Sequence, residues 1–215
     1  MRFQSHFALV SAVCCLALLA LGAAGPAAAA PLSGSSTGLS APDHTITFSE
    51  VTLSQSTPIA GAYAAFGATF DNLVYDTNYS GIYGNMSGPD ARNWINDQFN
   101  RGIIYVYFNA PVSDAALAVI GSFAVPSYFT SYLKGQVVES FTAVAAASAG
   151  NTNNFYGFTN SYFDEISLNM TPSVSQNAAL VDNVQFNTAV PEPGSLLLLG
   201  AALLGLGTAA RRRHA

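Results

Sequence analysis

Residues 102–108 read GIIYVYF, a run of β-branched and aromatic side chains that favours an extended strand. Further strand-like segments lie on both sides of it, separated by turn-rich pieces such as Asn109-Ala110-Pro111 and Lys134-Gly135. These segments read HTITF (44–48), ALAVIGSF (116–123), QVVESFTAVAA (136–146), FDEISL (163–168) and ALVDNVQF (179–186). Seven or more short strands at intervals of roughly 10 to 20 residues predict an all-β fold, an antiparallel β-sandwich.

These strands fit one domain, because residues 31–190 are about 160 in number, enough for a single hydrophobic core. This part of the chain holds three basic residues and eleven carboxylates, a net charge of −8. Phosphate binding needs clusters of Lys and Arg, so the charge excludes nucleic acid and anionic membrane surfaces as partners.

The N-terminal segment, residues 1–30, has the order of a secretory signal peptide: Arg2, an apolar run from Phe7 to Ala24, and small residues at its end. Cleavage after Ala29 or Ala30 fits that pattern, and Pro31 favours Ala29. The alternative is an uncleaved N-terminal anchor. Both cysteines, Cys14 and Cys15, lie inside this segment, so the exported chain is expected to have no disulfide.

The next segment, residues 31–43, reads PLSGSSTGLSAPD. Its Ser, Gly and Pro content predicts a flexible leader. The β-sandwich domain is therefore expected to span residues 44–188, and residues 189–215 form a separate C-terminal element.

That C-terminal element contains Pro191-Glu192-Pro193, an uncharged apolar run at 194–210, and Arg211, Arg212 and Arg213. The prolines favour an extended, accessible chain. The 17-residue run would form a helix of about 25 Å, just long enough to cross a bilayer, with the arginines on the cytoplasmic side. We therefore expect a single C-terminal transmembrane helix, and the alternative is an ordinary anchor after a proline linker.

These three parts, in this order, resemble the PEP-CTERM sorting signal of Gram-negative bacteria. The resemblance implies recognition and cleavage by an exosortase, after a signal peptidase has acted and while the precursor is held transiently in the inner membrane. It further implies delivery to the cell surface or the extracellular matrix, where extracellular polysaccharide is a possible partner.

The segment 44–187 is similar to jelly-roll domains related to galactose-binding-like and carbohydrate-binding modules. The resemblance rests on ITFSEV (46–51), the spacing of Tyr63, Gly67 and Phe70, and the alternation D-x-[IV]-x-[LF] shared by the last two strands, 163–168 and 181–186. It implies a jelly-roll β-sandwich and says little about a ligand.

Catalytic motifs are absent from the sequence of this domain. His44 is its only histidine and stands at its start, so a Ser-His triad cannot form, and neither G-x-S-x-G nor H-E-x-x-H occurs. We therefore expect no enzyme and no catalytic residue.

Two groups of residues are candidates for binding. Glu50 follows the first strand and Asp182 lies in the last, and in the jelly-roll modules that this sequence resembles, these two strands often share a structural calcium. The alternative is a solvent-facing Glu50 and a turn-capping Asp182. The second group joins the only tryptophan, an aromatic platform for a sugar, to polar neighbours: Trp94, Tyr83, Asn93 and Asp97. The alternative is that Trp94 belongs to the core.

Three functions follow from these features. The leading one is an exported, non-catalytic surface or matrix protein associated with exopolysaccharide or biofilm. The second is a lectin-like carbohydrate-binding module, and the third is a secreted hydrolase.

Overall fold

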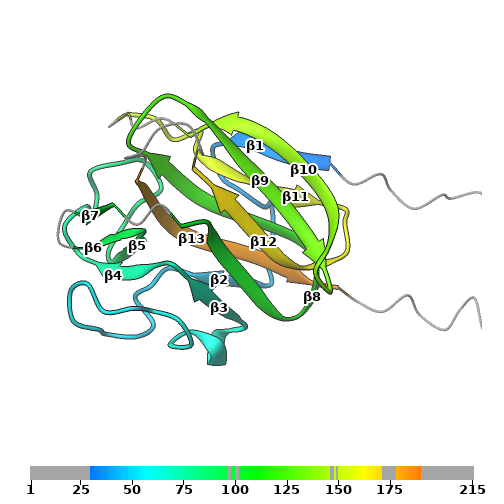
Figure 1. Ribbon diagram of the computed structural model, residues 1–215, viewed down its shortest axis with the longest axis horizontal. Coiled ribbons are helices and arrows are strands. Elements are labelled where there is room, and N and C mark those ends of the chain that lie inside the picture. Colours follow the sequence, from blue (N-terminus) through cyan, green and yellow to red (C-terminus); the bar gives the residue numbers. More distant parts are fainter. Residues whose placement is uncertain are drawn as a thin grey trace, which may run out of the picture.

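The computed structural model describes residues 30–95, 98–99, 102–145, 148, 150–170 and 178–189, and these form an antiparallel all-β domain (Figure 1). Helical structure in these ranges is confined to one 3-10 turn, η1 (Ala64–Phe66). The strands are β1 (Ala30–Ser35), β2 (His44–Ile46), β3 (Ala68–Asp71), β4 (Val74–Asp76), β5 (Asp90–Arg92), β6 (Trp94–Ile95), β7 (Gln98–Phe99), β8 (Ile104–Gly121), β9 (Pro126–Leu133), β10 (Gln136–Val144), β11 (Phe155–Thr159), β12 (Phe163–Asn169) and β13 (Ala179–Thr188). The predicted all-β fold is confirmed.

Strand β8 organises the two layers. Its first part, residues 104–108, pairs with β3 and β12, and its last part, residues 112–121, pairs with β11 and β13. A strand that changes partners in this way turns one hydrogen-bonded sheet into two packed layers. We call β10-β9-β12-β8-β3 sheet I and β1-β11-β8-β13-β5-β4 sheet II.

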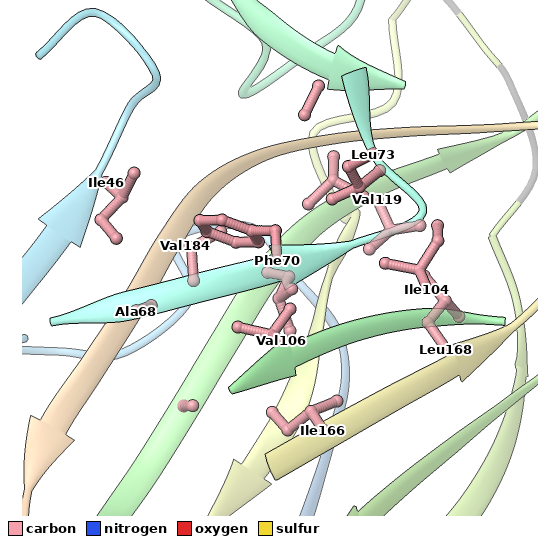
Figure 2. Packing of buried hydrophobic residues seen from close by; sticks show 14 of the residues in the cluster. Ile46, Ala68, Phe70, Leu73, Ile104, Val106, Val119, Ile166, Leu168 and Val184 are labelled. Atoms are coloured by element: carbon pink, nitrogen blue, oxygen red, sulfur yellow. The ribbon is translucent and has the colours of Figure 1, made fainter. Parts of the chain in front are cut away.

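The hydrophobic core lies between the two sheets. Ile104 and Val106 face it from the sheet I part of β8, while Leu117 and Val119 face it from the sheet II part. Phe70 of β3 packs among these strands, as Figure 2 shows. Burying one such side chain contributes about 1.5–3 kcal/mol, so this interior supplies much of the stability of a domain whose described residues include no cysteine.

Strand β13 contains a bulge just before the residues that pair with β2. Strand β13 shifts register between Asp182 and Gln185, where Asn183 has a φ of 47°. Asparagine tolerates this left-handed conformation better than most residues because its side chain can bond locally. The bulge leaves Val184 and Phe186 paired with β2, the predicted first strand.

The predicted flexible leader is wrong for its first residues, since residues 30–35 form β1 and pair with β11 from Ala30↔Thr159 to Ser35↔Phe155. On its other edge, β11 pairs closely with β8 at Gly157, where an added Cβ would lie 1.9 Å from the Ala115 carbonyl oxygen. Further on, the Leu39 N–H donates to Gln185 Oε1 at 2.7 Å. Composition predicted flexibility here because strand partners far along the chain leave no trace in a local Ser/Gly pattern.

The predicted signal segment up to Ala29 and the sorting element from Pro191 onward lie outside the described residues, and so does the expected C-terminal span. None of the helical structure that is described is long and apolar enough to cross a membrane.

Candidate functional site

The outer face of sheet II carries three aspartates in one cross-strand row. Asp76 of β4 is paired with Asp90 of β5, and the register Val181↔Ala91 places Asp182 of β13 on the other side of Asp90. Side chains directly opposite each other on neighbouring strands lie about 4.5–5.5 Å apart at Cβ. All three side chains are 0% exposed, so the row is a buried cluster of carboxyl groups.

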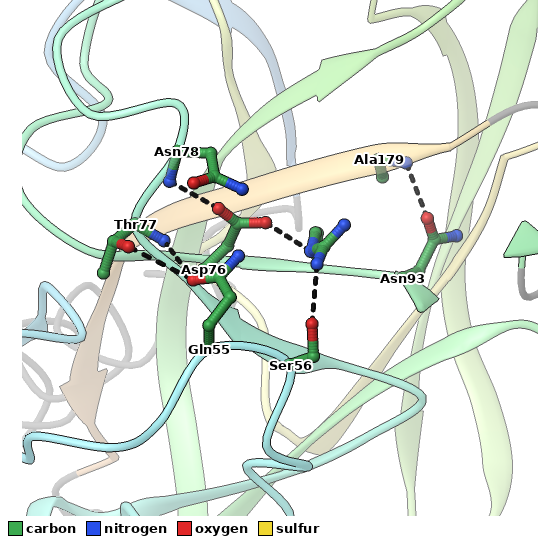
Figure 3. A network of polar contacts seen from close by, with 8 residues as sticks. Gln55, Ser56, Asp76, Thr77, Asn78, Asn93 and Ala179 are labelled. Carbon is green, nitrogen blue, oxygen red and sulfur yellow. Dashed lines mark hydrogen bonds and ion pairs between the residues drawn. The ribbon is translucent and has the colours of Figure 1, made fainter. Parts of the chain in front are cut away.

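Asp76 has a cationic partner. Its carboxylate forms an ion pair with Arg92 Nε, and its Oδ1 accepts the Asn78 N–H at 2.6 Å (Figure 3). The Arg92 guanidinium also donates to Ser56 Oγ at 2.8 Å and lies 5.1 Å from the centre of the Trp94 ring. Since a buried charge is costly without a partner, Arg92 balances one of the three carboxylates.

Asp182 is held by backbone donors. Its Oδ1 accepts the Asn183 N–H at 2.6 Å, and its Oδ2 accepts the Ser87 N–H at 3.0 Å. These bonds favour the charged form, but burial outweighs them and raises the pKa of Asp182 to about 8, with Glu50 adding to the rise.

Asparagines extend the polar network outward from Asp182. The Asn183 amide donates to the Asn85 carbonyl at 2.7 Å, and the Asn85 amide donates to Asn154 Oδ1 at 2.7 Å. Asn154 in turn donates to the Gly84 carbonyl at 2.7 Å. The network therefore ties the bulge of β13 to the loops that cover sheet II.

Asp90 differs from both neighbours, because neither of its carboxyl oxygens has a hydrogen-bond partner among the described residues. The pKa of Asp90 is raised to about 8, chiefly by burial and also by Asp76 and Asp182, while Arg92 opposes the rise. Within the described part of the chain, three buried carboxyl groups thus face one guanidinium. The raised pKa values favour protonated Asp90 and Asp182 at neutral pH, which would balance the remaining charge.

The predicted calcium pair is brought close but does not form a calcium site as it stands. Glu50 lies near enough to raise the pKa of Asp182, yet its Oε1 accepts the Thr47 N–H and hydroxyl at 2.8 and 2.9 Å. Calcium takes six to eight oxygen ligands. No group of three or more His, Cys, Asp or Glu side chains is arranged to hold a metal ion in the described ranges.

The structure does not present Trp94 as an exposed platform, since the Trp94 side chain is only 8% exposed and belongs to a second apolar cluster with Leu39, Met86 and Phe155. Tyr79 meets its ring edge-on at 5.7 Å, and Tyr83, half-buried, stacks on Tyr79.

Of the polar residues predicted beside Trp94, the structure describes Asn93. Asn93 is buried and its Oδ1 accepts the Ala179 N–H at 2.8 Å, which makes it a structural residue of sheet II (Figure 3). Asp97 lies outside the described residues. The aromatic and amide residues at 79–94 therefore cover sheet II, and do not present a platform to solvent.

The outer face of sheet I is different, and the sequence reasoning did not single it out. It carries Tyr105 and Tyr107 from β8 and Tyr128 and Tyr132 from β9. Tyr107 is 37% exposed and Tyr128 is 45% exposed. The available signal was the alternation of Tyr105 and Tyr107 within GIIYVYF, since residues two apart on a strand share one face.

Comparison with known proteins concerns the C-terminal end. Residues 189–213 match the family model described as the PEP-CTERM protein-sorting motif. The chain carries a PEP-CTERM sorting motif. This confirms the predicted resemblance to the PEP-CTERM sorting signal, and the motif implies an exported precursor that an exosortase processes. The matched range contains Pro191, Glu192, Pro193, Arg211, Arg212 and Arg213, whose individual roles in sorting stay predictions. A search of curated protein sequences gives no match.

Proposed function

We propose that this protein is exported, is processed at both ends, and acts as a non-catalytic component of the cell surface or of an extracellular polysaccharide matrix. The observation that carries the proposal is the PEP-CTERM sorting motif at residues 189–213, which begins where the β-sandwich ends. The last described strand, β13, ends at Thr188, and the Ala189 N–H donates to the Pro111 carbonyl at 3.1 Å. The sorting motif therefore follows the folded domain directly.

The positions of the two chain ends support this arrangement. Strand β1 begins at Ala30 beside Thr159, and β13 ends at Thr188, on the same side of the domain in Figure 1. Asp114 connects the two places, since its Oδ1 accepts the Asn160 N–H at 2.8 Å and its Oδ2 accepts the Asn187 amide at 3.1 Å. A precursor held in the inner membrane by its two apolar segments would have this side toward the bilayer and the rest of the domain away from it.

Cleavage after Ala29 fits the fold better than cleavage after Ala30. Ala30 is the first residue of β1, and its carbonyl oxygen accepts the Thr159 hydroxyl at 3.1 Å. A cut after Ala29 leaves this bond and the whole strand intact, whereas a cut after Ala30 removes the bond and the first residue of the strand.

A non-catalytic role is favoured by the burial of the acidic row. Asp90 and Asp182 have the raised pKa values that acid-base catalysis uses, but both side chains are 0% exposed. A substrate cannot reach them without opening the covering loops.

Mass spectrometry of the protein from the medium and from membranes tests the proposal. We expect the released form to begin at Ala30 and to lack Arg211, Arg212 and Arg213. Glu192→Ala should leave the full C-terminus in the membrane fraction, while Gln136→Ala, at the exposed first residue of β10, should be processed like the wild type. A wild-type protein that retains all three arginines and stays in the inner membrane would contradict the proposal.

A further inference from the structure

The open face of sheet I, defined by Tyr105, Tyr107, Tyr128 and Tyr132, is an ordered array of rings and hydroxyl groups. Register places Tyr107, Glu165 and Tyr132 side by side on β8, β12 and β9. The next row on the same face reads Tyr105, Ser167 and Thr130. Because neighbouring strands lie about 4.8 Å apart, Tyr107 and Tyr132 are separated by roughly 10 Å across β12.

We propose that this open face binds a neutral, hydroxyl-rich polysaccharide chain. The proposal deepens the proposed function by naming the class of matrix partner. It rests on that function only in assuming that the protein reaches the extracellular polymer after export.

The rings supply apolar platforms with polar edges. Tyr105 and Tyr107 lie with their ring centres 5.8 Å apart and their planes only 12° from parallel. Tyrosine offers an apolar face and a hydroxyl at low cost in side-chain entropy, which suits a ligand whose rings have apolar C–H faces and hydroxyl rims. Because the rings stand on hydrogen-bonded strands, little ordering is needed on binding.

Acceptors for sugar hydroxyls lie between the rings. Glu165 is half-buried beside Tyr107, and burial raises its pKa, with Asp164 adding to the rise. The register places Glu165 opposite Tyr107 and Asp71 opposite Tyr105 on this face. Burial raises the pKa of Tyr107, and Glu165, Asp71 and Tyr105 add to the rise. Carboxylate oxygens accept hydrogen bonds from hydroxyl groups, and such charge-assisted bonds are the stronger kind.

Charge selects a neutral polymer over an acidic one. The two carboxylates on this face, Asp71 and Glu165, would repel uronate, sulfate or phosphate groups. Of the three basic residues at 31–190, Arg92 is buried in sheet II and Lys134 sits in the β9–β10 turn, while Arg101 lies outside the described residues.

The same charge argues against a second copy of the chain as the occupant. Two copies stacked on this face would bring Asp71 and Glu165 of each toward the other, and each domain carries a net charge of −8 over residues 31–190.

Affinity gel electrophoresis of the full chain, purified in detergent, tests the proposal without depending on export or sorting. The probes are hydroxyethyl cellulose, laminarin and dextran as neutral polymers and alginate as the acidic one. We expect retardation by at least one neutral polymer, weakened about tenfold or more in Tyr107→Ala and Tyr128→Ala. Tyr162→Ala is the matched control, because Tyr162 is 52% exposed but lies outside the open face.

Melting temperatures of each variant establish that it is folded, and Tyr128→Ala, at the more exposed position, serves if Tyr107→Ala does not fold. The proposal is overturned if none of the neutral polymers retards the wild type, if alginate alone does, or if Tyr128→Ala binds as the wild type does. Concentration-dependent dimers that Tyr128→Ala abolishes would also overturn it, since the face would then join two copies. If the protein binds a neutral polymer but is not sorted and processed in cells, the proposed function is contradicted and the binding proposal stands.

Discussion

The two outer faces of this sandwich contain similar residue types in opposite roles. On the outer face of sheet II, Trp94 lies under the loops at 36–39 and 79–87, and Tyr79 of the second loop packs against it in a second apolar cluster. On sheet I, Tyr107 and Tyr128 remain 37% and 45% exposed. The difference is the cover: loops between strands pack over one face and leave the other open. An aromatic residue on a strand therefore belongs to a core or to a surface according to what covers its sheet.

The cover has the same effect on carboxyl groups. Asp90 and Asp182, on the covered face, are 0% exposed, and burial raises the pKa of each to about 8. On the open face, Asp71 is exposed and Glu165 is half-buried. Substitutions on the two faces therefore test whether cover determines the role of each side chain.

The largest expected effect is that of Trp94→Ala on the covered face. Removing a buried tryptophan leaves a cavity and removes the ring that contacts Arg92, and such changes cost about 3–5 kcal/mol. Urea denaturation measures the change as a lower midpoint at unchanged slope. If Trp94→Ala loses less than about 1 kcal/mol, the loops at 36–39 and 79–87 do not pack over sheet II as described.

The next effect is on the pH dependence of stability, through Asp90→Asn. The folded pKa of about 8 lies above the ordinary value of 3.8, so the folded state keeps a proton that the unfolded state loses between about pH 4 and pH 8. Wild-type stability therefore falls as pH rises through that window, by at most about 1.4 kcal/mol per pH unit for each such group. Asp90→Asn should flatten the fall and melt higher than the wild type at pH 9, with a smaller difference at pH 5.

Asp43→Asn, at an exposed position, is the control and should follow the wild-type curve. Melting curves in calcium and in EGTA distinguish whether protons or a bound calcium ion balance the buried charge. If calcium is the balancing ion, calcium at about 100 times its Kd adds roughly 2.7 kcal/mol and Asp182→Asn abolishes the gain. A wild type that melts identically in calcium and EGTA but shows no fall between pH 5 and pH 9 would contradict both explanations.

A smaller effect is expected at the bulge of β13, which fixes Asp182 against the loops. Asn183→Ala loses the bond to the Asn85 carbonyl and places alanine at a φ of 47°, which together should cost about 1–3 kcal/mol. Asn183→Gly loses the same bond but tolerates the angle, so it should cost less than alanine. Equal losses in the two variants, measured by urea denaturation, would show that the backbone angle contributes nothing.

The sequence predicted what depends on local pattern. GIIYVYF does contain most of the first part of β8, and ALVDNVQF lies within β13, because alternation and β-branched residues report a strand directly. The sorting motif could also be predicted from the sequence, since its three parts are contiguous. Which face of the sandwich is covered by loops could not be predicted, because that depends on which loops fold back over which sheet.

The missed features all depend on register between distant residues. Asp76, Asp90 and Asp182 stand 14 and 92 positions apart in sequence and meet only because β4, β5 and β13 are neighbours. The same holds for β1, whose partner β11 begins 120 residues after it ends. A Trp with polar neighbours resembled an exposed platform for this reason: its covering residues Leu39 and Phe155 come from other parts of the chain.

The smallest expected effect on stability is that of Tyr128→Ala on the open face. With 45% of its side chain exposed, Tyr128 loses little buried area on truncation, so the cost should stay below about 1 kcal/mol in urea denaturation. Trp94→Ala is the matched aromatic truncation on the covered face, and the ratio of the two losses measures how different the faces are. The experiment is best run at two protein concentrations a hundredfold apart. If Tyr128→Ala costs as much as Trp94→Ala, and only at the higher concentration, then the open face is covered in solution by a second copy, and the contrast between the two faces holds for the monomer alone.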